Sequence, residues 1–575
     1  MSTQLHQSKA RASNVSCLSG FFMNQKLLSP DVRIREASLQ LLEQFIGTDS
    51  SMMTPEFFAI LWDDVLRRSI ARTAVPSDMR ESGTEACLEY PDTEGWESLE
   101  TSLKGISICL SYCSELYSHS VDTEVLIRLS QHANRFAREQ VQFILHELVR
   151  NCTDQLDSRI IEMIAVGLGD NWSQVRYAAG ATTRCLVRHS ISRNDTAPLQ
   201  KKIIPLLLLN RHFVAEGIKR QSQETWRILV GPAGGLGLVL LCMDNILEHI
   251  LAAIESNNHS ARESASACMY EIIVRVLVDG KNHFVLEENI YLILRMITAI
   301  LEDDAWPVRQ FGQQAVCTLF EKCPIFLSDN MRKFVSSHGE YIAGLLLTDV
   351  CNPILPIRVS ATEALAAVGS IIWETSSVSG ERTVRYLEEN LDKCCKEVHS
   401  PSQFEDNVRR ICGDQCFENR PMYSCSSLVT NAAISKMHKH STSDDCCGTG
   451  SVELSAASQP WEISDGCIRL YAQLVKRSQL LGGLTQQLHS RCMRKLLQVL
   501  ATQGFSKDHE IHKLIMSNLV PILRTCVPGG QCALDCQSLL HDFMGFFEKS
   551  LHSSHGGPTI LELTSVIHSL SLSSR

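Results

Sequence analysis

The stretch LGDNWSQVRYAAGATTRCLVRH, residues 168–189, reads as a polar turn that enters an amphipathic helix. Gly169, Asp170 and Asn171 form the turn, and residues of these types favour turns and helix caps. After the turn, apolar or small residues recur at three- and four-residue steps and so share one helical face: Val175, Ala178, Ala179, Thr182, Cys185 and Leu186. We therefore expect a helix that packs one face against neighbouring helices.

The core of this stretch recurs along the chain. A basic residue occupies the same place in similar patterns at Arg35, Arg138, Arg176, Lys219, Arg262, Arg309 and Arg358. From Arg138 onward these positions are 38 to 49 residues apart, enough for two helices and two turns. Six residues before the basic position stand the turn formers Ser29, Asp170, Ser256, Asp303 and Asn352, whereas His132 and Phe213 break the pattern. The period predicts stacked helical pairs, two of them degenerate.

The core Asp-x4-Val-Arg-x-x-Ala, repeated at about forty residues, resembles the repeat of the HEAT/armadillo superfamily. The likeness covers about residues 25–375 and is weaker beyond them. It implies an all-α fold, a right-handed α-α superhelix in which each pair needs its neighbours to bury an apolar face. It also implies a structural ladder between adjacent repeats, which we assign to Asp170, Arg176, Asp303 and Arg309.

The sequence divides into four regions. We expect a flexible N-terminus at 1–24, a repeat array at 25–398, a disordered insertion at 399–460, and C-terminal helical repeats or a cap at 461–575. The gap of 103 residues between Arg35 and Arg138 exceeds two plain repeats, and the acidic stretch 75–97 is interpreted as an exposed loop between repeats. The helices that precede the motif helices are expected at Ser158–Leu168, Met243–Glu255 and Glu288–Leu301.

Bulk composition narrows the class of protein. The 575 residues exceed one compact core, and 44% apolar residues argue against wholesale disorder. The net charge of −10 disfavours nucleic-acid binding, which needs a concentrated basic surface. No apolar run is long enough to span a membrane, and the N-terminus lacks a signal-peptide pattern. Many of the 23 cysteines lie in apolar helical patterns, which indicates free thiols and a cytoplasmic location, with the nucleus as a further site.

Metal-ligand residues cluster between residues 394 and 447, most of them within the insertion. The zinc candidates are Cys412, Cys416, His438, His440, Cys446 and Cys447. Their spacing matches no common zinc finger, so the preferred interpretation is a flexible polar loop without a cofactor. A zinc-binding or redox-sensitive protein acting through residues 394–447 stays open as an alternative of another class.

The sequence carries no catalytic motif. The glycine-rich stretch 231–237 follows a helix instead of a strand, so it indicates a turn and not a phosphate-binding loop. Neither Gly-x-Ser-x-Gly nor His-Glu-x-x-His occurs, and no pair of residues suggests acid–base catalysis. We therefore predict that the protein is not an enzyme.

Two groups of residues are candidates for partner binding. Trp172 and Trp306 precede their aligned arginines, where a Trp either staples its own helix or anchors a partner. The second group comprises Arg211, His212, Glu216 and Arg220. These residues either pair with one another along the helix or line a polar binding groove, and both interpretations stay open. The extended surface implied by the resemblance favours a non-catalytic scaffold or adaptor that binds a protein partner. The alternative within binding proteins is an importin-type nuclear transport receptor.

Overall fold

A computed structural model of the chain describes residues 26–48, 55–73, 96–117, 121–152, 156–279, 281–322, 329–375, 377–397, 458–477, 485–502, 505 and 507–525. These residues form helices and turns, and none of them lies in a strand. The expected all-α fold is thereby confirmed. No helix among the described residues has the length and apolar character that crossing a bilayer requires. Contacts divide the chain into two units, whose described parts run from residue 26 to 268 and from 269 to 525.

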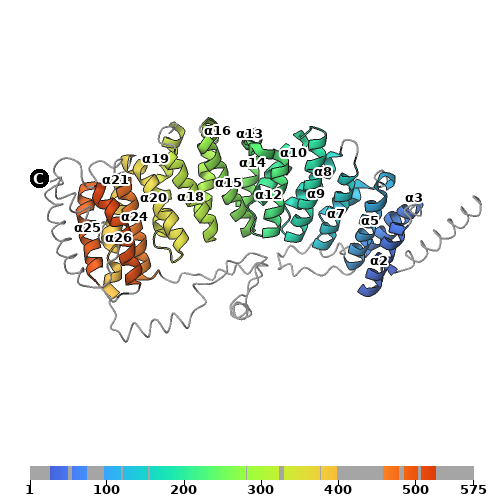
Figure 1. The fold of residues 1–575 in the computed structure, drawn as a ribbon, viewed down its shortest axis with the longest axis horizontal. Coiled ribbons are helices and arrows are strands. Elements are labelled where there is room, and N and C mark those ends of the chain that lie inside the picture. Colours follow the sequence, from blue (N-terminus) through green and yellow to red (C-terminus); the bar gives the residue numbers. More distant parts are fainter. Residues whose placement is uncertain are drawn as a thin grey trace, which may run out of the picture. The chain divides into compact units, whose positions relative to one another are not determined.

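The first unit begins with single helices and continues in helical pairs (Figure 1). Its elements are α2 (Val32–Thr48), α3 (Pro55–Ala59), the π-helical η3 (Ile60–Leu66), α4 (Arg67–Thr73), α5 (Trp96–Tyr117), α6 (Thr123–Ser130), α7 (Arg135–Arg150), α8 (Ser158–Leu168), α9 (Ser173–Ser192), α10 (Ala197–Gln200), α11 (Ile203–Asn210), α12 (Glu216–Val230), η5 (Gly231–Ala233), α13 (Leu236–Leu241) and α14 (Met243–Ile254). Helix α15 (His259–Asp279) reaches into the second unit.

The motif helices of the first unit pack against one another in file. Helix α5 contacts α7, α7 contacts α9, and α9 contacts α12, while α6, α8, α11 and α14 form a second file beside them. Three of these helices begin at a capped turn: the side chains of Asp122, Asn134 and Asp157 accept backbone N–H bonds at the starts of α6, α7 and α8. The apolar faces meet between the two files, where side chains such as Ile144, Ile164 and Leu186 are buried. Stacking therefore supplies the core that a single pair lacks.

The second unit repeats this arrangement (Figure 1). Its elements are α16 (His283–Glu288), α17 (Ile290–Leu301), α18 (Trp306–Lys322), α19 (Asp329–Asp349), α20 (Leu355–Thr375), α21 (Ser377–Asn390), the 3-10 helix η6 (Lys393–Glu397), α24 (Pro460–Lys476), α25 (Thr485–Ala501) and α26 (Asp508–Thr525). Helices α18, α20, α24 and α26 pack in file, with α17, α19, α21 and α25 beside them. Helix α24 thus continues the file from α20, although 62 residues separate η6 from it.

Some expected boundaries need correction. The C-terminal bound of the loop expected at 75–97 is wrong, because Trp96 and Glu97 are the first residues of α5. The end of the array expected at 25–398 consists of α21 and the 3-10 helix η6. The turn expected at 231–237 is narrower, because η5 occupies Gly231–Ala233 and α13 begins at Leu236. Gly231, Gly234 and Gly235 have positive φ, which glycine accommodates without strain. The insertion expected at 399–460 lies, up to residue 457, outside the described residues.

Candidate protein-binding site

The aligned arginines bind the backbone of the turn before their own helix. In Arg35, Arg138, Arg262, Arg309 and Arg358, Nη1 donates to the carbonyl oxygen six residues earlier, at 2.6 to 3.1 Å. In Arg176, Nε donates to the Asp170 carbonyl. The partner is a backbone atom, so the side chain at that position is only weakly constrained. His132 is not a turn former, yet its carbonyl oxygen accepts the same bond from Arg138.

The direction of helical side chains explains this spacing. A side chain near the start of a helix leans toward the N-terminus, so a long arginine reaches back over the first turn. The carbonyls there follow the end of the preceding helix and lack intrahelical partners. Within the described residues no comparable bond joins Lys219 to Phe213. The Phe213 ring instead lies beneath the guanidinium of Arg176, 4.5 Å from its centroid.

The same guanidinium groups also bind an acceptor on the next helical pair along the chain. Arg35 pairs with Glu97 at 2.9 Å, Arg138 with Asp170 at 2.7 Å, and Arg309 with Asp349 at 3.0 Å. Arg358 pairs with Asp465 at 2.7 Å. Arg176 donates to the amide oxygen of Asn210 at 2.7 Å. Each such arginine thus fixes its own turn and ties it to the neighbouring pair.

Asp170, Arg176 and Arg309 of the four predicted ladder residues form contacts between adjacent pairs, but not with each other's side chains. The Asp170 carboxylate binds Arg138 of the preceding pair and also accepts the backbone N–H of Trp172 at 2.8 Å. The Asp303 carboxylate accepts the backbone N–H of Ala305 at 2.8 Å, and only its carbonyl meets Arg309. Burial lowers the pKa of Arg176 to about 10, so the guanidinium stays charged at neutral pH.

The two tryptophans lie at helix starts, half-buried. Trp172 is the N-cap residue of α9, and the Arg135 guanidinium lies 4.1 Å from its ring centroid. Arg135 also lies over Phe136, whose ring stacks on Trp96 at 4.7 Å. These residues extend across α5, α7 and the start of α9, so Trp172 takes part in contacts between repeats. Trp306 is the first residue of α18 and precedes Pro307.

The second predicted group does not converge on one groove. The Arg211 guanidinium packs over the Trp226 ring at 5.2 Å, and its carbonyl accepts a bond from Gln223. His212 is half-buried in the turn before α12. Glu216 and Arg220 are 68% and 75% exposed and form an ion pair of 3.8 Å along α12. Intrahelical pairing thus describes Glu216 and Arg220, while Arg211 packs against Trp226 of α12.

The zinc candidates lie outside the described residues. In the part of the chain that the structure describes, no group of three or more histidine, cysteine or acidic side chains is arranged to hold a metal ion.

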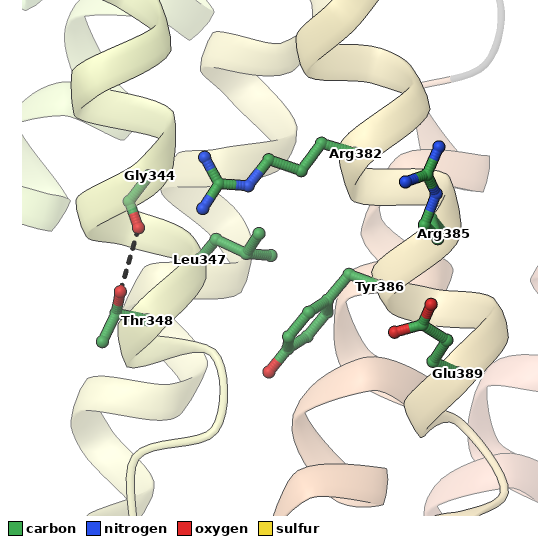
Figure 2. A pocket seen from close by; sticks show the side chains of 7 residues that line it. All are labelled: Gly344, Leu347, Thr348, Arg382, Arg385, Tyr386 and Glu389. Atoms are coloured by element: carbon green, nitrogen blue, oxygen red, sulfur yellow. Dashed lines mark hydrogen bonds between the residues drawn. The ribbon is translucent and has the colours of Figure 1, made fainter.

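A groove that sequence reasoning missed lies between α19 and α21 in the second unit (Figure 2). It encloses about 430 Å³, and α19 contributes Gly344, Leu347 and Thr348. Helix α21 contributes the other lining residues: Arg382, Arg385, Tyr386 and Glu389. Figure 2 shows Arg382 extending across the gap toward Gly344 and Leu347, with the Tyr386 ring directed into the same gap.

Both walls of the groove are fixed by buried or bridging polar contacts. At the end of α19, the Asp349 carboxylate accepts bonds from Arg309, Gln313 and Asn352, at 2.7 to 3.3 Å. On the other wall, Glu388 pairs with Arg491, and Asp392, just beyond α21, pairs with Lys495 of α25. The groove is therefore held open by contacts outside it.

Charge and space make this groove suitable for an anionic chain. Arg382 and Arg385 are exposed, and within the described residues neither forms an ion pair. A Cβ added at Gly344 would meet nothing within 4 Å, so the α19 wall leaves room beside Arg382. The sequence signal that could have indicated this groove is the helical spacing of Arg382, Arg385 and Tyr386. Nothing in the sequence placed them opposite a glycine of α19.

No family model matches the sequence, and no curated protein is significantly similar to it. Solved structures are similar at low identity. Kap121p is 12% identical, with 97% of this chain and 56% of that chain covered and a TM-score of 0.28, so this chain spans little more than half of its length. Yeast importin-beta (Kap95p) is 11% identical, with 95% and 71% covered and a TM-score of 0.32.

A structure from work on the interaction between cadherin and beta-catenin is 12% identical, with 95% of this chain and 98% of that chain covered and a TM-score of 0.30. Superpositions this loose carry no argument about the role of the present chain. Its own helical pairs and arginine contacts show that the described chain is built from stacked helical pairs.

Proposed function

We propose that this chain is a non-catalytic scaffold that binds an extended acidic segment of a partner protein in the groove between α19 and α21. The observation that carries the proposal is the pair of exposed arginines, Arg382 and Arg385, beside open space at Gly344. An arginine guanidinium binds carboxylates through several N–H donors and is therefore suited to acidic side chains. We place this activity in the cytoplasm, with no cofactor.

The arrangement favours an extended peptide over a small molecule. Gly344 allows a peptide backbone to approach α19 closely, and Leu347 offers an apolar contact beside it. The Tyr386 ring adds a flat amphipathic surface, a type enriched in protein interfaces. Because the walls are fixed elsewhere, little ordering accompanies binding, which lowers its entropic cost.

The test uses the full chain and a fluorescein-labelled decaglutamate peptide, with decaglutamine as the neutral probe. Fluorescence anisotropy at low ionic strength is expected to show binding of decaglutamate only. Arg382→Glu removes a charge-assisted contact and adds repulsion, so affinity should fall at least about tenfold, equivalent to about 1.4 kcal/mol. Gly344→Leu fills the open space and should weaken binding similarly.

Two matched variants separate the groove from general effects. Arg220→Glu changes the same charge at an exposed position of α12, and Gly237→Leu fills another helical glycine whose Cβ would meet nothing within 4 Å. Both should bind decaglutamate as the unmodified chain does. Equal losses in all four variants, or no decaglutamate binding at all, would contradict the proposal. In cell extracts, partners that co-purify should be lost with Gly344→Leu and retained with Gly237→Leu.

A further inference from the structure

Two cysteines of the second unit meet where α24 approaches the end of α19. Cys351 lies in the turn after α19 and is half-buried, whereas Cys467 is in α24 and fully buried. The backbones approach most closely at their neighbours, because a Cβ on Gly466 would overlap the Val350 carbonyl. Cys351 directly follows Val350 and Cys467 directly follows Gly466, so this backbone contact brings the two cysteines close together. Both sulfurs are free in this structure.

The surroundings of Cys351 stabilise a thiolate. The Tyr386 hydroxyl contacts its sulfur and can donate a hydrogen bond. The positive charges of Arg358 and Lys393 act in the same direction. With the Cys467 contact as the largest cause, these groups lower the pKa of Cys351 to about 7 against the opposing effect of burial.

Other described thiols have the opposite environment. Burial raises the pKa of Cys317, Cys394 and Cys492 to about 12 and holds that of Cys467 well above its usual range. Among the described cysteines whose pKa departs clearly from the usual value, Cys351 is the one with a lowered pKa. It is thus a half-buried thiol with a lowered pKa close to the fully buried Cys467. This pairing resembles the arrangement of an attacking and a resolving cysteine.

We propose that Cys351 and Cys467 form a two-cysteine oxidation site for a small peroxide. The Cys351 thiolate attacks one peroxide oxygen, the O–O bond breaks, and the products are a sulfenic acid on Cys351 and hydroxide, which takes up a proton as water. The Cys467 thiol then attacks the Cys351 sulfur, losing its proton as the S–O bond breaks and water leaves. The two thiols have together lost two electrons in forming the disulfide, and the peroxide has gained these two electrons. A dithiol reductant reverses the step by thiol–disulfide exchange.

The disulfide would join the end of α19 to α24 covalently. It would also remove the thiolate that the Tyr386 hydroxyl contacts at the edge of the groove. The site itself depends on the contact between α24 and the turn after α19, and not on the proposed partner. Oxidation and decaglutamate binding can therefore be measured separately, and either can fail without the other.

The test treats the full chain with hydrogen peroxide and maps its peptides without reduction. We expect a cross-linked peptide pair containing Cys351 and Cys467 that disappears after treatment with dithiothreitol. In Cys467→Ala, dimedone should instead trap a sulfenic acid on Cys351. Cys317, which is also half-buried, serves as the internal control and should react at least about tenfold more slowly at neutral pH, because a thiol with a much higher pKa holds little thiolate.

A further variant tests the environment of Cys351. Tyr386→Phe removes the hydroxyl donor, so the pH midpoint for alkylation of Cys351 by iodoacetamide should move upward from about 7. The proposal is overturned if Cys351 reacts no faster than Cys317 in the unmodified chain. It is equally overturned if peroxide leaves a dimedone-reactive Cys351 there without a cross-link to Cys467. Neither measurement depends on the folding of a variant.

Discussion

Replacing Arg358 by methionine is expected to destabilise the second unit by about 3 kcal/mol. The Arg358 side chain is 2% exposed, and its Nε donates to Asp465 at 2.7 Å. Its Nη1 donates to the carbonyl oxygens of Asn352 and Pro353 at 2.6 and 3.2 Å. Methionine fills much of the same volume but donates none of these bonds. Two carbonyl oxygens and a buried carboxylate therefore lose a donor.

The size of this destabilisation depends on which hydrogen bonds Asp465 keeps after the substitution. Breaking a buried ion pair by removing one partner costs about 3–5 kcal/mol. Asp465 keeps the bonds from Arg469 at 2.9 and 3.1 Å, which places the expected loss at the lower end of that range. Arg358→Lys should give an intermediate loss, because lysine keeps the charge but not the fork of donors. Arg220→Met is the control, and at this exposed pair the change should stay within about 0.5 kcal/mol.

The assay is urea unfolding followed by circular dichroism, with hydrogen exchange of α20 and α24. Exchange is needed because a repeat array can open in parts instead of in one step. We expect faster exchange in both helices for Arg358→Met. The reasoning is refuted if Arg358→Met and Arg220→Met unfold within about 0.5 kcal/mol of each other.

Three further outcomes are expected. Gly466→Ala should lower the free energy of unfolding in urea by about 1–3 kcal/mol, because the added methyl group overlaps the Val350 carbonyl. Gly344→Ala is the control, and a loss in Gly466→Ala no larger than in this control would contradict the prediction. Arg138→Met should increase hydrogen exchange in α7 and α9 of the first unit, since Asp170 is 7% exposed there, and unchanged exchange would contradict the role of this pair. Burial and the nearby Arg138 charge lower the pKa of His132, whose Nδ1 accepts the Asn134 N–H at 3.0 Å. The unfolded chain, with a pKa of about 6.5, therefore binds this proton first on acidification, so stability is full above about pH 6.5 and falls below it. His132→Gln should reduce that fall in urea midpoint, whereas the same change at exposed His509 is the control.

The fold class could be predicted from the sequence because its signals are local. The three- and four-residue apolar spacing in residues 168–189 specifies a helical face, and the repeated arginine marks where such helices begin. The helix Ser158–Leu168 was predicted with its observed bounds for the same reason. Helix α24 lacks the aligned arginine, so its place in the file beside α20 was not predicted.

The sequence by itself determined the helical pairs and the position of the arginine in each motif helix. Tertiary structure decided what those arginines bind: a backbone carbonyl with no residue signature, and acceptors such as Glu97, Asp349 and Asp465 far along the chain. It also decided that Arg382 faces Gly344 and that the turn after α19 approaches α24 at Val350 and Gly466, next to Cys351 and Cys467. The physical reason is that periodicity encodes which face of a helix is apolar. Which residues meet across stacked helices depends on the packing and on the lengths of the connections between them.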